Sequence, residues 1–429
     1  MLYFVPAWLP VLALLNLLIG ACSGPPRAGA GGAEKLIQDL TPRLTASPAL
    51  APVLSKAEEY RVQVLFSRVI RDQRSGTRHL ERWSYRLGAE YFYPASSIKL
   101  AAAIALFPAL ESLNSGRSDS LITLDSPATF GQVASGATPF VRTNASATRV
   151  VTAGVDGVPG ETVTLRRELT KLFAVSDNEA FNRLYDVIGH GPLNASLHEM
   201  GFGSVVLNHR LSDSTPRSDQ RATVAVTFAA EGKGDARKID YVTIPQRSSA
   251  LTLVNSPPGL AVGKDYMKKG ALAGVPMDFG SRNGVSLTDL QDMLVMLFAP
   301  DINIGKHPPP SVLAAAPLLE YLSGLTPRTS GVAQYELAGY GDDYCKLFLP
   351  GLPKAGGEQW RVFNKIGQAY GFTIDNAWIV NRESGEEYFL SAVIYTNADG
   401  VLNDDRYEYA TVAEPFMAAL ARELCVPAR

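Results

Sequence analysis

The chain has 429 residues, and 46% of them are hydrophobic, which is enough to build a large buried core without disulfides or a structural metal. Its 40 basic and 42 acidic residues are interspersed and give a formal net charge of −2. This balance lacks the positive field that binding to nucleic acid needs, so no nucleic-acid partner is expected.

The first 21 residues carry a targeting signal. The apolar run from Val11 to Leu18 leads into Ile19-Gly20-Ala21-Cys22, which resembles the lipobox of bacterial lipoproteins. The resemblance implies that residues 1–21 are a removed signal peptide and that Cys22 carries a lipid, so the protein would be exported and anchored to a membrane, in the periplasm or at the cell surface. No Lys or Arg precedes the run, which leaves an ordinary signal peptide or a short membrane anchor as the alternative.

Residues 22–33 are rich in Gly, Ala and Pro and are predicted to be a flexible tether. The folded body is expected to start at residue 34. Its predicted elements are, in chain order, helical character over 34–60, strands over 61–72 and 80–87, and helices over 98–110, 165–173 and 179–188, the last two capped by Thr164 and Asp177.

Residues 204–285 are rich in turn formers and are predicted to be an insertion with some strand. Ser286 then opens a helix, strands follow over 376–380 and 388–396, and Pro415 begins a last helix to Leu424. This order predicts an α+β fold, in which residues 34–93 and 321–429 build an antiparallel sheet flanked by N- and C-terminal helices. Residues 94–320 form an inserted helical domain.

The motifs that would carry chemistry contain serine and lysine. The chain has no His-Glu-x-x-His, Cys-x-x-Cys, Gly-x-Ser-x-Gly or phosphate-loop pattern, so neither a metal nor another cofactor is expected. Ser96 stands at the start of a predicted helix with Lys99 one turn later on the same face, where an amine could activate the hydroxyl. The free N–H groups of a helix N-terminus could stabilise a developing oxyanion.

Two further motifs follow in the chain. Ser176-Asp177-Asn178 lies between two predicted helices, where a helix cap is the simplest explanation for it alone, and Lys365-Ile366-Gly367 precedes the C-terminal strands. The three motifs in this order resemble the Ser-x-x-Lys, Ser-Asp-Asn and Lys-Thr-Gly set of class A β-lactamases and penicillin-binding proteins. The resemblance covers nearly all of the mature chain and implies the β-lactamase/transpeptidase-like fold.

The resemblance also implies a role for each residue. Ser96 would be the nucleophile, Lys99 would help to deprotonate it, and Ser176 would relay a proton to the leaving group. Asn178 would position Lys99 and the substrate amide. Lys365 would attract a substrate carboxylate and lower the pKa of Lys99, Gly367 would let a substrate approach an edge strand, and the backbone N–H groups of Ser96 and Gln368 would form the oxyanion hole.

Two departures from the family pattern bear on activity. Ile366 stands where the family has Thr or Ser, so a hydroxyl for the substrate carboxylate is missing. The Glu-x-x-Leu-Asn motif, whose glutamate activates the deacylating water in class A enzymes, is absent between Asn178 and Lys365. Glu199 and Asp213 are the nearby carboxylates that could replace it.

The sequence thus predicts a serine hydrolase that forms an acyl-Ser96 intermediate with a β-lactam or a related amide or ester, and its partners are expected to be a small-molecule β-lactam or cell-wall peptide. A D-alanyl-D-alanine peptidase or esterase, and a non-catalytic cell-wall-binding lipoprotein of the same fold, remain as alternatives. Lipidation of Cys22 would leave Cys345 and Cys425 as either a disulfide or two buried thiols, and the thiols are favoured.

Overall fold

The computed structural model describes residues 37–131, 163–213, 219–232, 239–333, 335, 339–353 and 359–426. The described residues belong to one compact unit, Leu36–Arg429. The predicted signal peptide, Cys22 and the tether lie outside the described residues.

A six-stranded sheet in the order β1-β3-β2-β13-β12-β11 forms the centre of this unit. Neighbouring strands are antiparallel, except that the short β1 pairs with β3 in parallel. β2 pairs with β13, with Leu65 opposite Ser391, so strands from the two ends of the chain lie side by side. The strands are β1 (Gln38–Asp39), β2 (Gln63–Arg71), β3 (Arg78–Tyr85), β11 (Trp360–Ala369), β12 (Phe372–Asn381) and β13 (Glu387–Tyr395).

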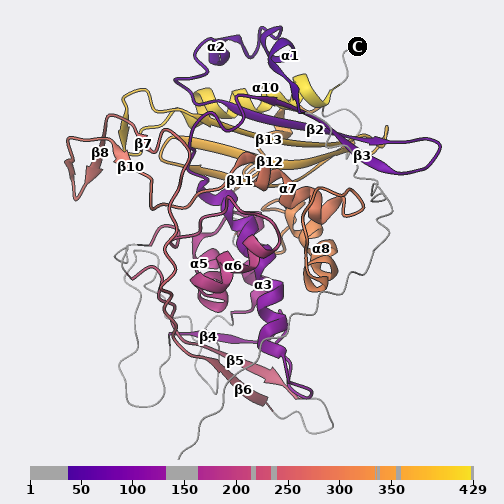
Figure 1. Ribbon diagram of the computed structural model, residues 1–429, viewed down its shortest axis with the longest axis vertical. Coiled ribbons are helices and arrows are strands. Elements are labelled where there is room, and N and C mark those ends of the chain that lie inside the picture. Colours follow the sequence, from indigo (N-terminus) through magenta and orange to yellow (C-terminus); the bar gives the residue numbers. More distant parts are fainter. Residues whose placement is uncertain are drawn as a thin grey trace, which may run out of the picture. The chain divides into compact units, whose positions relative to one another are not determined.

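Alternating side chains on these strands supply two separate cores. On β12, Phe372 and Ile374 belong to one apolar cluster, whereas Ala377 and Ile379 belong to the other, because successive side chains of a strand point to opposite faces. One face is covered by α1 (Thr41–Thr45), α2 (Ala51–Leu54) and α10 (Glu414–Cys425), and the other by the helical part of the chain (Figure 1). The predicted α+β architecture is confirmed.

The helical part surrounds a central apolar helix. A 3₁₀ turn, η1 (Ala95–Ile98), runs into α3 (Lys99–Asn114), which packs among five further helices. By length and composition Ala95–Asn114 could cross a membrane, but its residues are mostly buried in the core of this fold. The further helices are α4 (Leu165–Ala174), α5 (Asn178–Ile188), α6 (His190–Glu199), α7 (Leu287–Phe298) and α8 (Pro310–Ser323).

The predicted helix caps are confirmed. The Thr164 hydroxyl accepts a hydrogen bond from the N–H of Arg167, and the Asp177 carboxylate accepts one from the N–H of Ala180. Ser286 caps α7 in the same way. Each cap satisfies an N–H group that the first turn of a helix leaves without a partner.

Some predicted elements differ from the structure. Where helical character was predicted over 34–60, the described residues 37–60 form the two-residue strand β1 and the short helices α1 and α2. Lys365 lies within a strand, β11, rather than before the C-terminal strands. Asn364, Lys365 and Gln368 hide the apolar alternation of β11, which explains why the pattern missed it. α6 and α8 were not predicted, and the proposed boundary at residue 320 falls inside α8.

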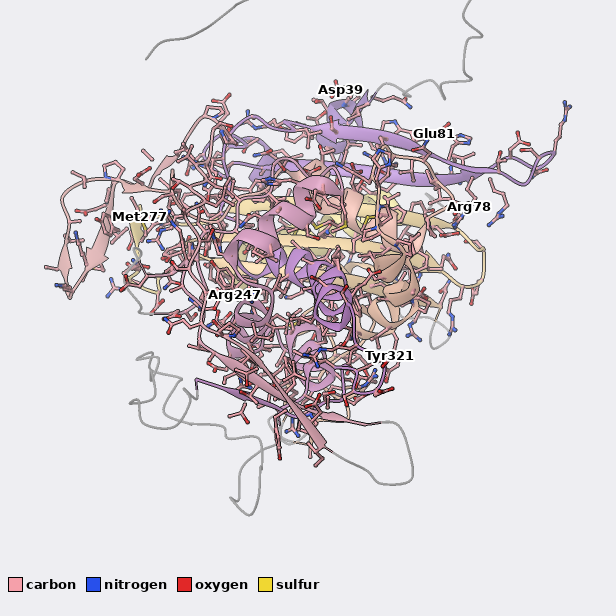
Figure 2. All side chains as sticks on the ribbon, turned by 60° about the horizontal axis from the view of Figure 1, so that its bottom comes forward. Asp39, Arg78, Glu81, Arg247, Met277 and Tyr321 are labelled. Carbon is pink, nitrogen blue, oxygen red and sulfur yellow. The ribbon has the colours of Figure 1, made fainter. Side chains whose placement is uncertain are left out.

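The insertion carries small sheets. β5 (Val226–Glu231) pairs with β6 (Ile239–Ile244) and with β4 (Ala128–Phe130), and Arg247, labelled in Figure 2, donates to Val187 O at 2.7 Å and so ties this region to the end of α5. The remaining short elements are β7 (Ala261–Val262), β8 (Asp265–Lys268), β9 (Ala271–Leu272), β10 (Met277–Asp278), β14 (Val401–Leu402), η2 (Leu349–Gly351) and the π-helical η3 (Tyr409–Ala413).

Both described cysteines have free thiols. Cys345 and Cys425 are buried in the core on the α10 side of the sheet, as small apolar side chains. The favoured alternative, two buried thiols, is therefore the one in the structure.

Candidate active site

Ser96 lies where η1 begins, next to the edge strand of the sheet. Every residue from Tyr91 to Leu100 is buried except Ser96, which is partly exposed. It lines a cavity of about 480 Å³, called here the Ser96 cavity, together with Asn178 and Gln368. The one accessible side chain of this segment is thus a hydroxyl facing a cavity.

Lys99 is the first residue of α3 and is completely buried. Its ammonium Nζ donates to Asn178 Oδ1 at 2.7 Å, to the carbonyl oxygen of Ser176, and to Ser176 Oγ at 3.3 Å. The Ser96 hydroxyl makes no hydrogen bond to any residue of the described ranges. Hydrogen bonds between catalytic groups often tighten only when substrate is present, so Lys99 remains a candidate base for Ser96.

The second motif forms the tight connection between α4 and α5. Ser176 has a φ of +60°, a left-handed conformation that is unfavourable for a residue other than glycine. Asp177 caps α5 immediately after it, which holds the turn in place and leaves Asn178 as the first residue of the helix. The connection therefore presents Ser176 and Asn178 together to Lys99.

Lys365 reaches the same hydroxyl from β11. Its Nζ donates to Ser176 Oγ at 2.8 Å and to Ile366 O at 3.0 Å, and only 1% of its surface is exposed. Ser176 Oγ is therefore shared by Lys99 and Lys365. The residues of the three motifs are brought together although 269 positions separate Ser96 from Lys365 in the chain.

Burial governs the charge of both lysines. Burial, with the nearby positive charge of Lys365 as the next cause, lowers the pKa of Lys99 well below its usual value. Burial also lowers the pKa of Lys365 to about 8, against the opposing influence of Cys345 and Asp375. An amine with a lowered pKa is neutral more often at a given pH, and only a neutral amine can accept a proton from a hydroxyl.

Gly367 allows β11 to lie directly against η1. A Cβ atom at this position would lie 2.5 Å from Pro94 O, 2.7 Å from Ser97 N and 2.8 Å from Ser96 N, closer than such atoms can come. The strand residue Gln368 consequently lines the Ser96 cavity beside Ser96. The two segments whose N–H groups were predicted to form an oxyanion hole meet at this glycine.

Three other residues named from the sequence lie elsewhere. Ile366 points to the opposite face of the sheet and packs into the α10-side core, because it alternates with Lys365 along β11. Glu199 is exposed at the end of α6, and the Asp213 carboxylate is buried 4.0 Å from Arg210 Nε. Neither carboxylate is among the described residues that line the Ser96 cavity.

Ser212 is a part of the site that the sequence did not indicate. Its hydroxyl accepts a hydrogen bond from Asn178 Nδ2 at 2.8 Å, so the Asn178 amide is fixed by Ser212 at its nitrogen and by Lys99 at its oxygen. Leu211, the residue before Ser212, is held in turn: its backbone N–H and C=O groups both form hydrogen bonds with the Asn182 side chain. No local pattern marks a serine in an irregular segment, so tertiary structure alone reveals it.

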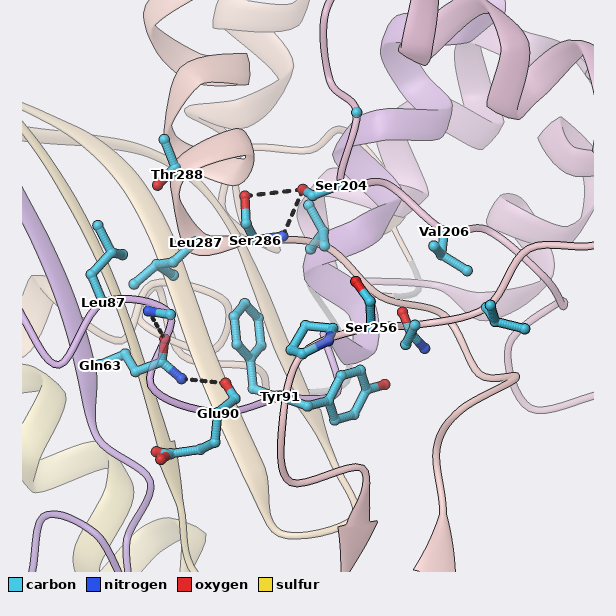
Figure 3. A pocket seen from close by; sticks show the side chains of 17 residues that line it. Gln63, Leu87, Glu90, Tyr91, Ser204, Val206, Ser256, Ser286, Leu287 and Thr288 are labelled. Carbon is cyan, nitrogen blue, oxygen red and sulfur yellow. Dashed lines mark hydrogen bonds between the residues drawn. The ribbon is translucent and has the colours of Figure 1, made fainter.

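A second cavity lies away from these residues. Figure 3 shows this cavity of about 210 Å³, which is lined by Gln63, Tyr91 and residues around Ser204 and Ser286. Gln63 donates to Glu90 O and accepts from Gly88 N, and Ser204 pairs with Ser286, so these polar groups are satisfied within the protein. None of the predicted catalytic residues lines it.

Within the described residues, no group of three or more His, Cys, Asp or Glu side chains is placed to hold a metal ion.

Comparison with known proteins finds one protein family whose model matches part of the chain. Residues 60–236 match the model of the beta-lactamase enzyme family, and this range contains Ser96, Lys99, Ser176 and Asn178. No curated protein sequence matches the chain.

Solved structures similar to the chain include PBP-A, with 15% identity and a TM-score of 0.47 over 90% of this chain and 98% of that one. A beta-lactamase from Desulfarculus baarsii DSM 2075 has 15% identity and a TM-score of 0.47 over 90% and 97% of the two chains. One from Sphaerobacter thermophilus DSM 20745 has 15% identity and a TM-score of 0.44 over 89% and 98%.

Proposed function

We propose that this chain is a serine hydrolase that forms an acyl-enzyme on Ser96 with a β-lactam or a related cell-wall amide or ester. The match of residues 60–236 to the model of the beta-lactamase enzyme family supports the proposal. The observation that carries the proposal is the convergence of Lys99 and Lys365 on Ser176 Oγ. Asn178, which binds Lys99, lines the same cavity as Ser96, the one accessible hydroxyl of the η1 segment. Burying two amines around one serine lowers the stability of the fold, because burying a charge is costly. A role in proton transfer explains why they are there.

The reaction begins with neutral Lys99 accepting the proton of Ser96 as the hydroxyl oxygen attacks the carbonyl carbon of the substrate. The negative charge that develops on the carbonyl oxygen would be stabilised by the N–H groups of Ser96 and Gln368. Ser176 then passes a proton to the leaving nitrogen or oxygen, and its own hydroxyl is reprotonated through the lysine pair. The carbon–leaving-group bond breaks, and the acyl group stays on Ser96.

An active-serine probe tests the proposal. A fluorescent penicillin and a fluorophosphonate, each followed by intact-mass spectrometry, would give one covalent adduct that maps to Ser96. A D-alanyl-D-alanine peptidase or esterase would share this adduct and would differ in the substrates that it turns over. A non-catalytic protein of the same fold would form no adduct with either probe, and that result would overturn the proposal.

We expect the acyl-enzyme to form faster than it is hydrolysed. Neither Glu199 nor Asp213 lines the Ser96 cavity, and the loss of a positioned general base slows a step by about 10²–10⁴-fold. After mixing with a penicillin, the adduct mass should therefore persist for many minutes while a chromogenic β-lactam is turned over slowly. Rapid turnover that is lost in Ser96→Ala would instead show that another group activates the second water.

We further propose that the protein is exported and tethered by a lipid on Cys22. The support is the sequence Ile19-Gly20-Ala21-Cys22 and the Gly, Ala and Pro-rich segment that follows it. Cys22→Ser should abolish lipid labelling and release the protein from membranes or block its processing. If the variant keeps the N-terminal mass and the membrane attachment of the wild type, the anchor lies elsewhere.

A further inference from the structure

Four of the residues that line the Ser96 cavity are tyrosines, called here the wall. They are Tyr93, Tyr370, Tyr407 and Tyr409, which come from three segments of the chain. The rings of Tyr407 and Tyr409 are 5.2 Å apart between centroids. This wall is thus built of aromatic rings with only hydroxyl groups as their polar atoms.

Backbone groups hold two of these rings in place. The N–H of Asn403 donates to Tyr407 Oη at 2.8 Å, and the N–H of Gly371 donates to Tyr409 Oη at 2.9 Å. Both phenols have raised pKa values, mainly because they are buried, so they remain neutral. A bound group therefore meets rings whose orientation is set before it arrives.

The segment that carries Tyr407 and Tyr409 has a negative net charge. Residues 399–409 contain four carboxylates and one guanidinium. The carboxylates of Asp399, Asp404 and Glu408 each accept a hydrogen bond from a nearby backbone N–H group.

Asp405 is the fourth carboxylate, and it differs from the other three. It has no hydrogen bond or ion pair with any residue of the described ranges, and it lines the Ser96 cavity. No Lys, Arg or His is among the described residues that line this cavity. The one formal charge among the described residues that line the cavity is therefore negative.

One ring of the wall already contacts a cation. The guanidinium of Arg282 lies 5.6 Å from the ring centroid of Tyr370 and donates to its hydroxyl at 3.4 Å, although Arg282 does not itself line the cavity. Aromatic faces attract cations because the ring quadrupole is negative above its plane. A carboxylate at the edge of such a wall strengthens this preference.

We propose that the wall selects substrates whose acyl part carries a cationic ammonium group, which Asp405 and the rings of Tyr407 and Tyr409 bind. The inference rests on the proposed acylation of Ser96 and adds a substrate class to it. The cation is assigned to the acyl part because, with an ester or a linear amide, that part stays on Ser96 once the leaving group has departed.

Three matched 4-nitrophenyl esters test the preference on the mature protein. Their acyl chains end in a trimethylammonium group, in the neutral and isosteric tert-butyl group, or in a carboxylate. The expected kcat/KM is about tenfold higher for the cationic ester than for the neutral one, and lowest for the anionic ester. The ratio of the first two should shrink as salt is added, because the site is partly open to solvent.

Two neighbouring carboxylates provide the variant and its control. Asp405→Asn should lower the cationic-to-neutral ratio by about fivefold or more, whereas Asp404→Asn, at a residue that does not line the cavity, should leave it within about twofold. Equal rates for the cationic and neutral esters, a preference for the anion, or the same loss in both variants would overturn the proposal.

A binding measurement separates this inference from the proposed function. Calorimetry with phenyltrimethylammonium on Ser96→Ala protein needs no acylation, and binding should weaken when Asp405→Asn is added. If no ester acylates Ser96 but this binding is present and depends on Asp405, the catalytic proposal fails and the cation site stands. If acylation occurs without such binding or ester preference, the cation site fails alone.

Discussion

Ser96→Ala is expected to abolish covalent labelling by β-lactams and fluorophosphonates. The nucleophile forms the bond that defines the intermediate, so its removal should reduce the acylation rate by roughly 10³-fold or more. Ser96 is partly exposed within a buried segment and makes no hydrogen bond to a residue that the structure describes, so its hydroxyl contributes little to the fold. The variant should keep the thermal unfolding midpoint of the wild type while intact-mass spectrometry shows no adduct.

The neighbouring serine is a matched control. Ser97 is completely buried, and its hydroxyl donates to Pro94 O at 2.7 Å, so it belongs to the scaffold of the turn. Ser97→Ala should cost about 1 kcal/mol of stability and still be labelled. Labelling that survives in Ser96→Ala, or that disappears only in Ser97→Ala, would contradict the assignment of the nucleophile.

Replacing Lys99 should have the second largest effect. Lys99→Met retains most of the buried volume but has no amine, and Lys99→Arg retains a cation that does not give up its proton. If Lys99 is the base that activates Ser96, both variants should acylate about 10²–10⁴-fold more slowly. Stopped-flow measurement of acylation gives the rate, and an unfolding curve separates it from loss of fold. Near-normal acylation by Lys99→Arg would show that the positive charge matters and the base does not.

The pH dependence of the acylation rate independently tests whether Lys99 acts as the base. Because burial and the charge of Lys365 lower its pKa, the amine loses its proton at a pH well below that of an exposed lysine. The active form is the neutral one, so the rate should rise with pH through this pKa and fall as the solution becomes more acidic. This rise of the rate with pH, the pH limb of acylation, should be absent in both Lys99 variants.

A second buried lysine serves as the control for Lys99. Lys346 is also buried with a pKa lowered to about 8, but it donates to Ser323 O, Val362 O and Asn364 Oδ1 and contacts none of the motif residues around Ser176. Lys346→Met should lower stability and leave the pH limb of acylation in place. If the pH-dependent rise in the acylation rate shifts in Lys346→Met and not in the Lys99 variants, the titrating amine is Lys346, and the assignment to Lys99 is wrong.

Local features were predictable from the sequence because they depend on neighbours in the chain. The caps Thr164, Asp177 and Ser286 each bond a backbone group three residues ahead, and the apolar periods of α7, β2 and β13 follow from helix and strand geometry alone. The strand β11 escaped because the polar residues that serve the site interrupt its alternation. The polar residues that serve the site thus hid the strand pattern of β11.

The sequence by itself determined the family resemblance, the order of the motifs and the sheet built from both chain ends. Only the tertiary structure decided that Ser176 Oγ is shared by two lysines, that Ser212 holds Asn178, and that Asp405 and the tyrosines line the cavity. It also decided that Ile366 packs away from the site and that Glu199 and Asp213 do not line it. These outcomes depend on strand register and on the packing of segments up to hundreds of residues apart, and a periodic pattern in one segment contains no information about which distant segment will lie against it.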